Sequence, residues 1–176
     1  MKLFVIVISV MALSGCFSTG PIDNRNFGNI DRISDLNGIY INRGSDGMIG
    51  GTYTYLSKII WPKDNNLHHV EIDKIIVTAS DDDKLLVEAM SGDSILKKQL
   101  FIKGIDFDIQ SGRIQLRRAL GGVNDNFAGA TYTSISLGLD TSGNGKYRNE
   151  ETFVGVGLLI PMVVHGTSDV RFSRIK

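Results

Sequence analysis

Residues 70–117 read VEIDKIIVTASDDDKLLVEAMSGDSILKKQLFIKGIDFDIQSGRIQLR, a series of short apolar runs separated by polar turns. The last run alternates strictly, because Ile114 and Leu116 fall on one face of an extended chain and their polar neighbours fall on the other. A period of two is typical of a strand with one buried face. This stretch therefore predicts consecutive antiparallel strands joined by tight turns.

The same pattern continues towards both ends of the chain. Strand-like runs cover residues 35–42, 53–61 and 131–139, and a nearly continuous apolar run at 153–164 predicts one or two buried strands. Residues 170–176 predict a final strand. We therefore expect an all-β domain of about eight to ten strands, either an antiparallel up-and-down barrel or a β-sandwich.

The N-terminus has the pattern of a secretory leader. Lys2 precedes an apolar run of about 11 residues, whereas a membrane-spanning helix needs roughly 20. Small residues then lead to a cysteine in the run Leu13-Ser14-Gly15-Cys16. This run resembles the lipobox of bacterial lipoproteins. The resemblance implies that the signal helix is cleaved before Cys16, and that Cys16 carries a diacylglyceryl group and an acylated amine.

The lipoprotein resemblance also implies an address. Two or three acyl chains hold a protein firmly on a membrane, and Phe17 stands where an Asp would favour retention in the inner membrane. We therefore expect the protein at the outer membrane, facing the periplasm. The expected organisation is a leader at 1–15, a lipidated flexible tether at 16–34 and an antiparallel β domain at 35–176.

The charge balance argues against one class of partner. The 19 basic and 19 acidic residues leave a formal net charge of zero. Such a chain has no electrostatic reason to bind nucleic acid. No phosphate loop, dinucleotide fingerprint or nucleophile elbow is present. We therefore expect no catalytic residues and no cofactor.

Two stretches contain metal-ligand residue types. His68 and His69 precede Glu71 and Asp73, and a third histidine, His165, is far away in sequence. Neighbouring residues on a strand face opposite sides, so His68 and His69 are poorly placed to share one ion. We expect a solvated start of a strand here, and no metal site.

The second stretch, residues 140–151, partly matches a calcium-binding loop. Asp140, Ser142 and Asn144 occupy alternate positions, and Glu151 is the twelfth residue. The flanking runs predict strands, whereas a calcium loop of this type joins two helices. We therefore expect a hairpin turn. The acidic run at 81–83 similarly predicts a charged hairpin tip.

One further resemblance concerns the start of the domain. Lipocalins commonly open their barrel with Gly-x-Trp, and an Arg near the last strand packs over that Trp. The chain has Gly38-Ile39-Tyr40, with Arg171 and Arg174 near its end. The resemblance implies a lipocalin-like barrel in which one of these arginines covers Tyr40.

Together these features predict a lipid-anchored, non-enzymatic envelope lipoprotein that acts by protein–protein contact at the periplasmic face of the outer membrane. Such a protein needs a filled interior and an exposed apolar or edge-strand surface. The alternative is a carrier or sensor of a small apolar ligand, which needs an apolar cavity of roughly 300–1,000 Å³.

Overall fold

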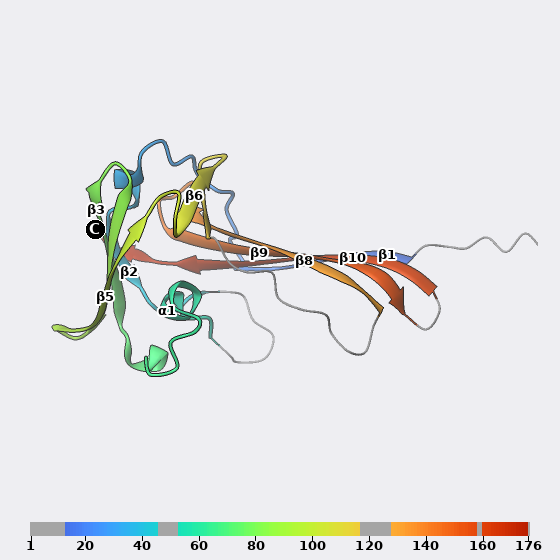
Figure 1. Cartoon of the computed structure of the whole chain (residues 1–176), viewed down its shortest axis with the longest axis horizontal. Helices are drawn as coiled ribbons and strands as arrows, with labels where there is room; N and C mark the ends of the chain where they lie inside the picture. Colours follow the sequence, from blue (N-terminus) through green and yellow to red (C-terminus); the bar gives the residue numbers. More distant parts are fainter. Residues whose placement is uncertain (1–12, 46–52, 117–127, 158–159, 176) are drawn as a thin grey trace, which may run out of the picture.

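Most of the apolar runs of the sequence form strands in the computed structural model, which describes residues 13–45, 53–116, 128–157 and 160–175. A six-stranded sheet has the order β1-β10-β9-β8-β7-β6, and a five-stranded sheet has the order β11-β2-β3-β4-β5 (Figure 1). Paired neighbours are antiparallel except β1, which runs parallel to β10. The strands are β1 (Leu13–Thr19), β2 (Gly38–Ile41), β3 (Lys74–Asp81), β4 (Lys84–Ser91), β5 (Ser94–Ile102), β6 (Phe107–Gln110), β7 (Arg113–Leu116), β8 (Ala128–Leu139), β9 (Gly145–Gly157), β10 (Ile160–Phe172) and β11 (Arg174–Ile175).

The fold is all-β, as the sequence predicts. Of the two architectures that the sequence left open, the arrangement is sandwich-like, and the sheets do not close into a barrel. Closure requires the end strands of a sheet to pair, but β5 and β11 remain at opposite ends of their sheet. The expected lipocalin-like barrel is therefore corrected to two open sheets.

The hydrophobic core lies in a head, where the five-stranded sheet meets the inner ends of β8, β9 and β10 (Figure 1). Ile75 and Phe172, one from each sheet, are completely buried. Burial of each large apolar side chain stabilises the fold by about 1.5–3 kcal/mol. The core residues are Ile30, Ile33, Leu36, Tyr40, Leu56, Ile59, Trp61, Ile72, Ile75, Leu85, Val87, Ala89, Phe107, Ile114, Val170 and Phe172.

Three strands continue beyond the head as a long arm (Figure 1). The outer parts of β8, β9 and β10 form this arm, and β1 lies along the free side of β10. We define the arm as residues 13–19, 128–135, 150–157 and 160–168. Of its described residues, none belongs to the core cluster. The arm is therefore ordered by strand pairing and by its continuity with the head.

One expected strand is a helix. Residues 53–61 predict a strand, but α1 (Leu56–Ile60) occupies most of this range, and 3-10 turns flank the sheet at η1 (Ile33–Leu36) and η2 (His69–Glu71). The start of α1 is held by buried Asn42, whose Oδ1 accepts a hydrogen bond from the Ser57 backbone N–H at 2.8 Å. Asn42 also binds the carbonyls of His69 and Ile72. These contacts join segments far apart in sequence, so local apolar pattern did not reveal them.

The expected flexible tether at 16–34 is packed against the domain. Residues 13–19 pair with β10, and Ile30 and Ile33 are buried in the core. The Gly28 backbone N–H donates to the Leu139 carbonyl at 2.8 Å. The polar residues of this segment therefore act in turns and hydrogen bonds. Of the expected leader at 1–15, residues 1–12 lie outside the described residues, while Leu13–Gly15 belong to β1 and pair with β10. Cleavage before Cys16 remains a prediction.

The apolar run at 153–164 forms strands, as expected, but these strands are not buried. It spans the ends of β9 and β10 in the arm, where Val154 and Val163 are 46% and 43% exposed. Residues 158–159 lie outside the described residues. The strands pair with each other, but the second sheet does not extend over them (Figure 1).

Candidate functional site

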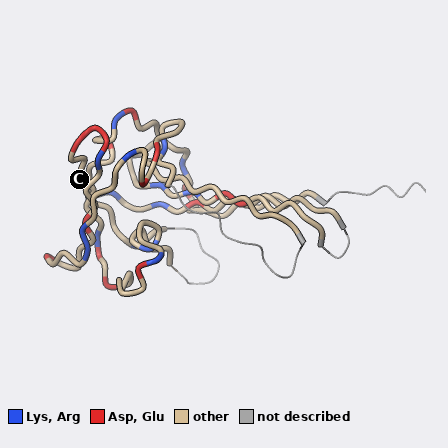
Figure 2. The backbone as a smooth tube through the Cα atoms, viewed as in Figure 1, with Lys and Arg blue, Asp and Glu red and all other residues tan. Residues whose placement is uncertain are grey.

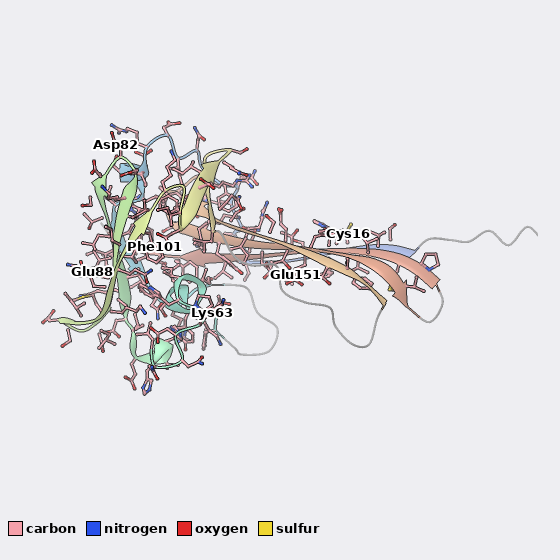
Figure 3. All side chains as sticks on the ribbon, in the orientation of Figure 1. Cys16, Lys63, Asp82, Glu88, Phe101 and Glu151 are labelled. Carbon is pink, nitrogen blue, oxygen red and sulfur yellow. The ribbon has the colours of Figure 1, made fainter. Side chains whose placement is uncertain are left out.

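Cys16 lies in β1, at the edge of the arm, and is exposed (Figure 3). It is in register with His165 of β10. The only strand partner of β1 is β10, so the other side of β1 forms the edge of the described sheet. The thiol therefore has the solvent access that covalent modification requires.

Cys16 belongs to a row of side chains that crosses the arm. Cys16 is opposite His165, His165 is opposite Thr152, and Thr152 is opposite Tyr132. Residues in register share a face of the sheet, so these four lie on one face. The Thr152 Oγ1 and His165 Nδ1 atoms are 3.0 Å apart, and Tyr132 is 60% exposed. We call these four residues the Cys16 row.

Figure 2 shows that the outer part of the arm carries no Lys, Arg, Asp or Glu among its described residues, and strand register places the last charged residues of the arm beside the Cys16 row. Glu151 and Glu150 come directly before Thr152, on the side of the row nearer the head. Figure 3 shows Cys16 and Glu151 on opposite faces of the arm. On the far side of the row are residues 128–131, 153–157 and 160–164, which include no Lys, Arg, Asp or Glu. We call these residues the arm tip.

The arm tip is apolar on both faces. Val154, Val156 and Val163 are 42–46% exposed on the face of the Cys16 row. The opposite face of the arm has a shallow hollow of about 340 Å³, which extends from the tip past the level of the Cys16 row to Glu151. A sheet in a water-soluble domain normally packs at least one face on a core. The hollow is lined by Phe17, Thr131, Glu151, Phe153, Met162, Val164 and Gly166.

A buried ion cluster lies where the arm joins the head. Asp169 of β10 is 1% exposed, and its carboxylate accepts hydrogen bonds from Arg148 Nε and Nη2, both at 2.7 Å. Lys146 Nζ is 2.9 Å from Asp169 Oδ2, and Asn24 Nδ2 donates to that oxygen at 2.7 Å. We call these four residues the base cluster. It ties the N-terminal segment to β9 and β10.

Asp169 stays ionised because its hydrogen bonds compensate for its burial. Burial alone would raise the pKa of the Asp169 carboxyl. The hydrogen bonds from Arg148, Lys146 and Asn24 outweigh that effect and lower the pKa to about 2. Asp169 therefore carries its charge throughout the physiological range.

The structure separates the three histidines. His68 Nδ1 lies 3.3 Å from Glu71 Oε1 on the surface of the head, and His69 Nδ1 lies 3.0 Å from Ser57 Oγ. His165 is in the arm. Within the described part of the chain, no group of three or more His, Cys, Asp and Glu residues could hold a metal ion.

His69 and Ser57 resemble a catalytic base and nucleophile only in their distance. Ser57 is completely buried in the start of α1, where no substrate reaches its hydroxyl. Burial, followed by the positive charge of Lys58, lowers the pKa of His69. This pair therefore connects η2 to the start of α1, and the buried Ser57 hydroxyl is not accessible as a nucleophile.

The partial calcium loop is a hairpin turn between β8 and β9. Asp140 Oδ1 accepts hydrogen bonds from the backbone N–H groups of Ser142 at 2.8 Å and Asn144 at 3.0 Å. Gly143 has φ +82°, a conformation that favours glycine. Glu151 lies along β9, away from the turn. The acidic run at 81–83 is likewise exposed at the β3–β4 turn, where Lys84 Nζ is 3.3 Å from Asp81 Oδ2.

The expected contact between a C-terminal arginine and Tyr40 is present. Arg174 is in register with Tyr40, and its guanidinium carbon lies 5.7 Å from the centre of the ring. Burial raises the pKa of Tyr40 to about 12. Arg171 instead pairs with Asp23. The two residues lie on neighbouring strands of an open sheet, so this contact is present without a lipocalin barrel.

The interior of the head is nearly filled. A cavity of about 90 Å³ lies between the sheets, among side chains that include Tyr40, Leu85, Phe107 and Phe172. Ligand sites for small molecules usually measure roughly 300–1,000 Å³. The head therefore offers much less room than the ligand-carrier alternative needs.

Comparison of the chain with protein-family models, with curated proteins and with solved structures finds no match. Among the described residues, no helix has both the length and the apolar character to cross a membrane.

Sequence reasoning identified Cys16 but missed the arm and the base cluster. The arm had a signal, because residues 152–168 lack charge at both odd and even positions. On a strand that pattern leaves neither face polar. The base cluster had no comparable signal, since Asn24 and Asp169 are 145 residues apart.

Proposed function

We propose that this chain is a lipid-anchored envelope lipoprotein, held at the periplasmic face of the outer membrane through Cys16, which acts by contact with another envelope protein. The observation that carries the proposal is the exposure of Cys16, the only cysteine of the sequence, at the end of a run that resembles a lipobox. Acyl chains on this residue would extend from the edge of the arm without disturbing the core.

The edge strand β5 supports the contact function. It ends the five-stranded sheet, and Ile95, Leu96 and Leu100 are 43–54% exposed along it. An edge strand offers unpaired backbone groups to an added strand, while side chains along it select the partner. The small cavity of the head favours this function over ligand transport, which remains the alternative.

Labelling with a palmitate analogue tests the anchor. In a Gram-negative host, the wild type should incorporate the label and fractionate with the outer membrane on a density gradient. The Cys16→Ser variant should incorporate none and should be either soluble in the periplasm or an uncut precursor. A Cys16→Ser protein that still floats with membranes after removal of its leader would refute the lipoprotein assignment.

Site-specific photocrosslinking tests the contact function. A photoreactive residue at Leu100 should give a discrete crosslinked species in cells if β5 binds a partner. The same residue at Val70, which is 75% exposed elsewhere on the head, is the matched control. Equal patterns from the two positions would count against β5 as the contact surface.

A further inference from the structure

We propose that the arm tip inserts into the lipid leaflet that holds the acyl chains of Cys16, with the Cys16 row at the level of the lipid headgroups. The proposal rests on the proposed lipid attachment and goes beyond it, because it gives the protein a second membrane contact. The lipid of the bilayer then covers both apolar faces of the arm tip.

The first argument is the position of the charge boundary. On the head side of the Cys16 row, Glu150 and Glu151 introduce charge, and on the far side the arm tip has none. A charged side chain is costly in hydrocarbon but well solvated among headgroups. The boundary falls beside the residue to which the lipid is attached. The anchor and the charge pattern thus place the membrane surface at the same level of the arm.

The second argument is length. From His165, opposite Cys16, the strand β10 continues for five residues to Ile160. At about 3.3 Å per residue this distance is roughly 17 Å. The hydrocarbon of one leaflet is about 15 Å deep, half of the ~30 Å core of a bilayer. The tip therefore matches the depth of one leaflet and is too short to cross both.

The third argument is the composition of the two faces. A surface that docks on one protein partner needs one apolar face, whereas the arm tip exposes Val154 and Val163 on one face and has Met162 and Val164 around the hollow of the other. Tyr132, in the Cys16 row, is an amphipathic aromatic residue of the kind enriched at membrane interfaces. Lipid can cover both faces simultaneously.

The sheet edges limit how deep the tip can lie. Hydrocarbon offers no hydrogen-bond partner to the backbone of an open edge, so open sheets do not span membranes. The described β8 pairs with β7 only at Leu137 and Ser136, which leaves residues 128–131 at an edge. We therefore expect the tip to stay within one leaflet, with water reaching its open edges from the headgroup side.

Fluorescence quenching tests the proposal on the mature, lipidated protein. The Val154→Trp variant is reconstituted in vesicles of phosphatidylethanolamine and phosphatidylglycerol whose acyl chains carry bromine. The wild type provides the baseline, since its single Trp61 is buried in the head core. Leu100→Trp is the exposed control on the head. We expect the bromolipid to quench the tryptophan at 154 strongly and that at 100 hardly at all.

Charge substitution provides a second readout that does not depend on the anchor. In the mature Cys16→Ser protein, added to unbrominated vesicles, Val163→Lys should weaken binding about tenfold. The matched control is Val70→Lys on the head, which should bind as its parent does. Circular dichroism and gel filtration establish that both variants are folded.

The outcomes separate the two proposals. If the wild type floats with vesicles but the tryptophan at 154 escapes quenching, the anchor holds and tip insertion is wrong. If that tryptophan is shielded without quenching and copies crosslink through the tip, the tip is an interface between copies, which also overturns the proposal. If the wild type carries no lipid but the Cys16→Ser protein binds vesicles and Val163→Lys abolishes this, the anchor is wrong and the tip still inserts.

Discussion

The head and the arm of this molecule share three strands and differ in how those strands are stabilised. In the head, β9 and β10 pack on a second sheet, and Val170 and Phe172 are buried. In the arm, the same strands pair only within their own sheet, and their apolar side chains face outwards. An apolar strand therefore predicts burial only when a second layer exists to cover it. Where none does, the apolar surface indicates a different environment.

The largest expected difference between the two regions is in the cost of removing an aromatic ring. Phe172→Ala should lower the free energy of unfolding by about 4 kcal/mol, because it opens a cavity in a completely buried site. Tyr132→Ala in the arm should change it by less than about 0.5 kcal/mol. Urea unfolding of the soluble Cys16→Ser protein measures both values. Similar losses would show that the arm contributes to the core.

The base cluster, where the regions join, should give the next largest effect. Asp169→Asn leaves the buried Lys146 ammonium without its counter-charge and should cost about 3 kcal/mol. Asp81→Asn, at an exposed turn, is the control and should be nearly neutral.

The same carboxylate predicts an acid dependence. Its folded pKa of about 2 lies below the unfolded value of 3.8, so its contribution is complete above that value and is lost as the pH falls towards 2. The loss should be about 2 kcal/mol, at 1.36 kcal/mol for each pKa unit. Urea unfolding at pH values from 5 to 2 should show this slope in the wild type and a weaker one in Asp169→Asn. If the free energy of unfolding fell equally with pH in both proteins, Asp169 would not be the cause of the acid dependence.

The turn between β8 and β9, at the head end of the shared strands, should contribute a smaller part of the stability of the head. Asp140→Ala removes two hydrogen bonds to backbone N–H groups from a buried carboxylate and should cost about 2 kcal/mol. Ser142→Ala keeps those bonds, since only the Ser142 backbone takes part, and should be neutral. Calcium should leave the melting temperature of the wild type unchanged. A rise with calcium would restore the metal-loop interpretation.

The smallest effect on stability is expected in the arm tip. Val163→Lys should change the free energy of unfolding by less than about 0.5 kcal/mol, because the side chain is already 43% exposed. Val70→Lys should behave alike in solution. A large loss of stability in Val163→Lys alone would mean that the tip is packed against another part of the protein.

The strands of residues 74–116 were predictable because alternation and turn residues act locally. Ile114 and Leu116, for example, were placed on one face from their spacing alone, and Ile114 is buried. The helix α1 was not predictable, because buried Asn42 fixes its first turn from another segment. Residues 16–34 pack against the domain through distant partners such as Asp169, and their local composition does not reveal those partners.

The candidate site was predictable only as a single residue. Cys16 is singled out by the lipobox-like run that it ends, whereas the row that it shares with His165, Thr152 and Tyr132 follows from strand register, which local pattern does not reveal. Charge spacing indicates that the tip lacks polar faces. It does not indicate that β1 brings Cys16 to the charge boundary.

Hydrogen–deuterium exchange of the lipidated protein, with and without vesicles of phosphatidylethanolamine and phosphatidylglycerol, compares the two regions under identical conditions. With vesicles, we expect slower exchange in peptides covering residues 128–131, 153–157 and 160–164. Peptides from β3, β4 and β5 should exchange at the same rate with and without vesicles. Unchanged exchange in the arm tip, on protein that remains bound to the vesicles, would contradict the account.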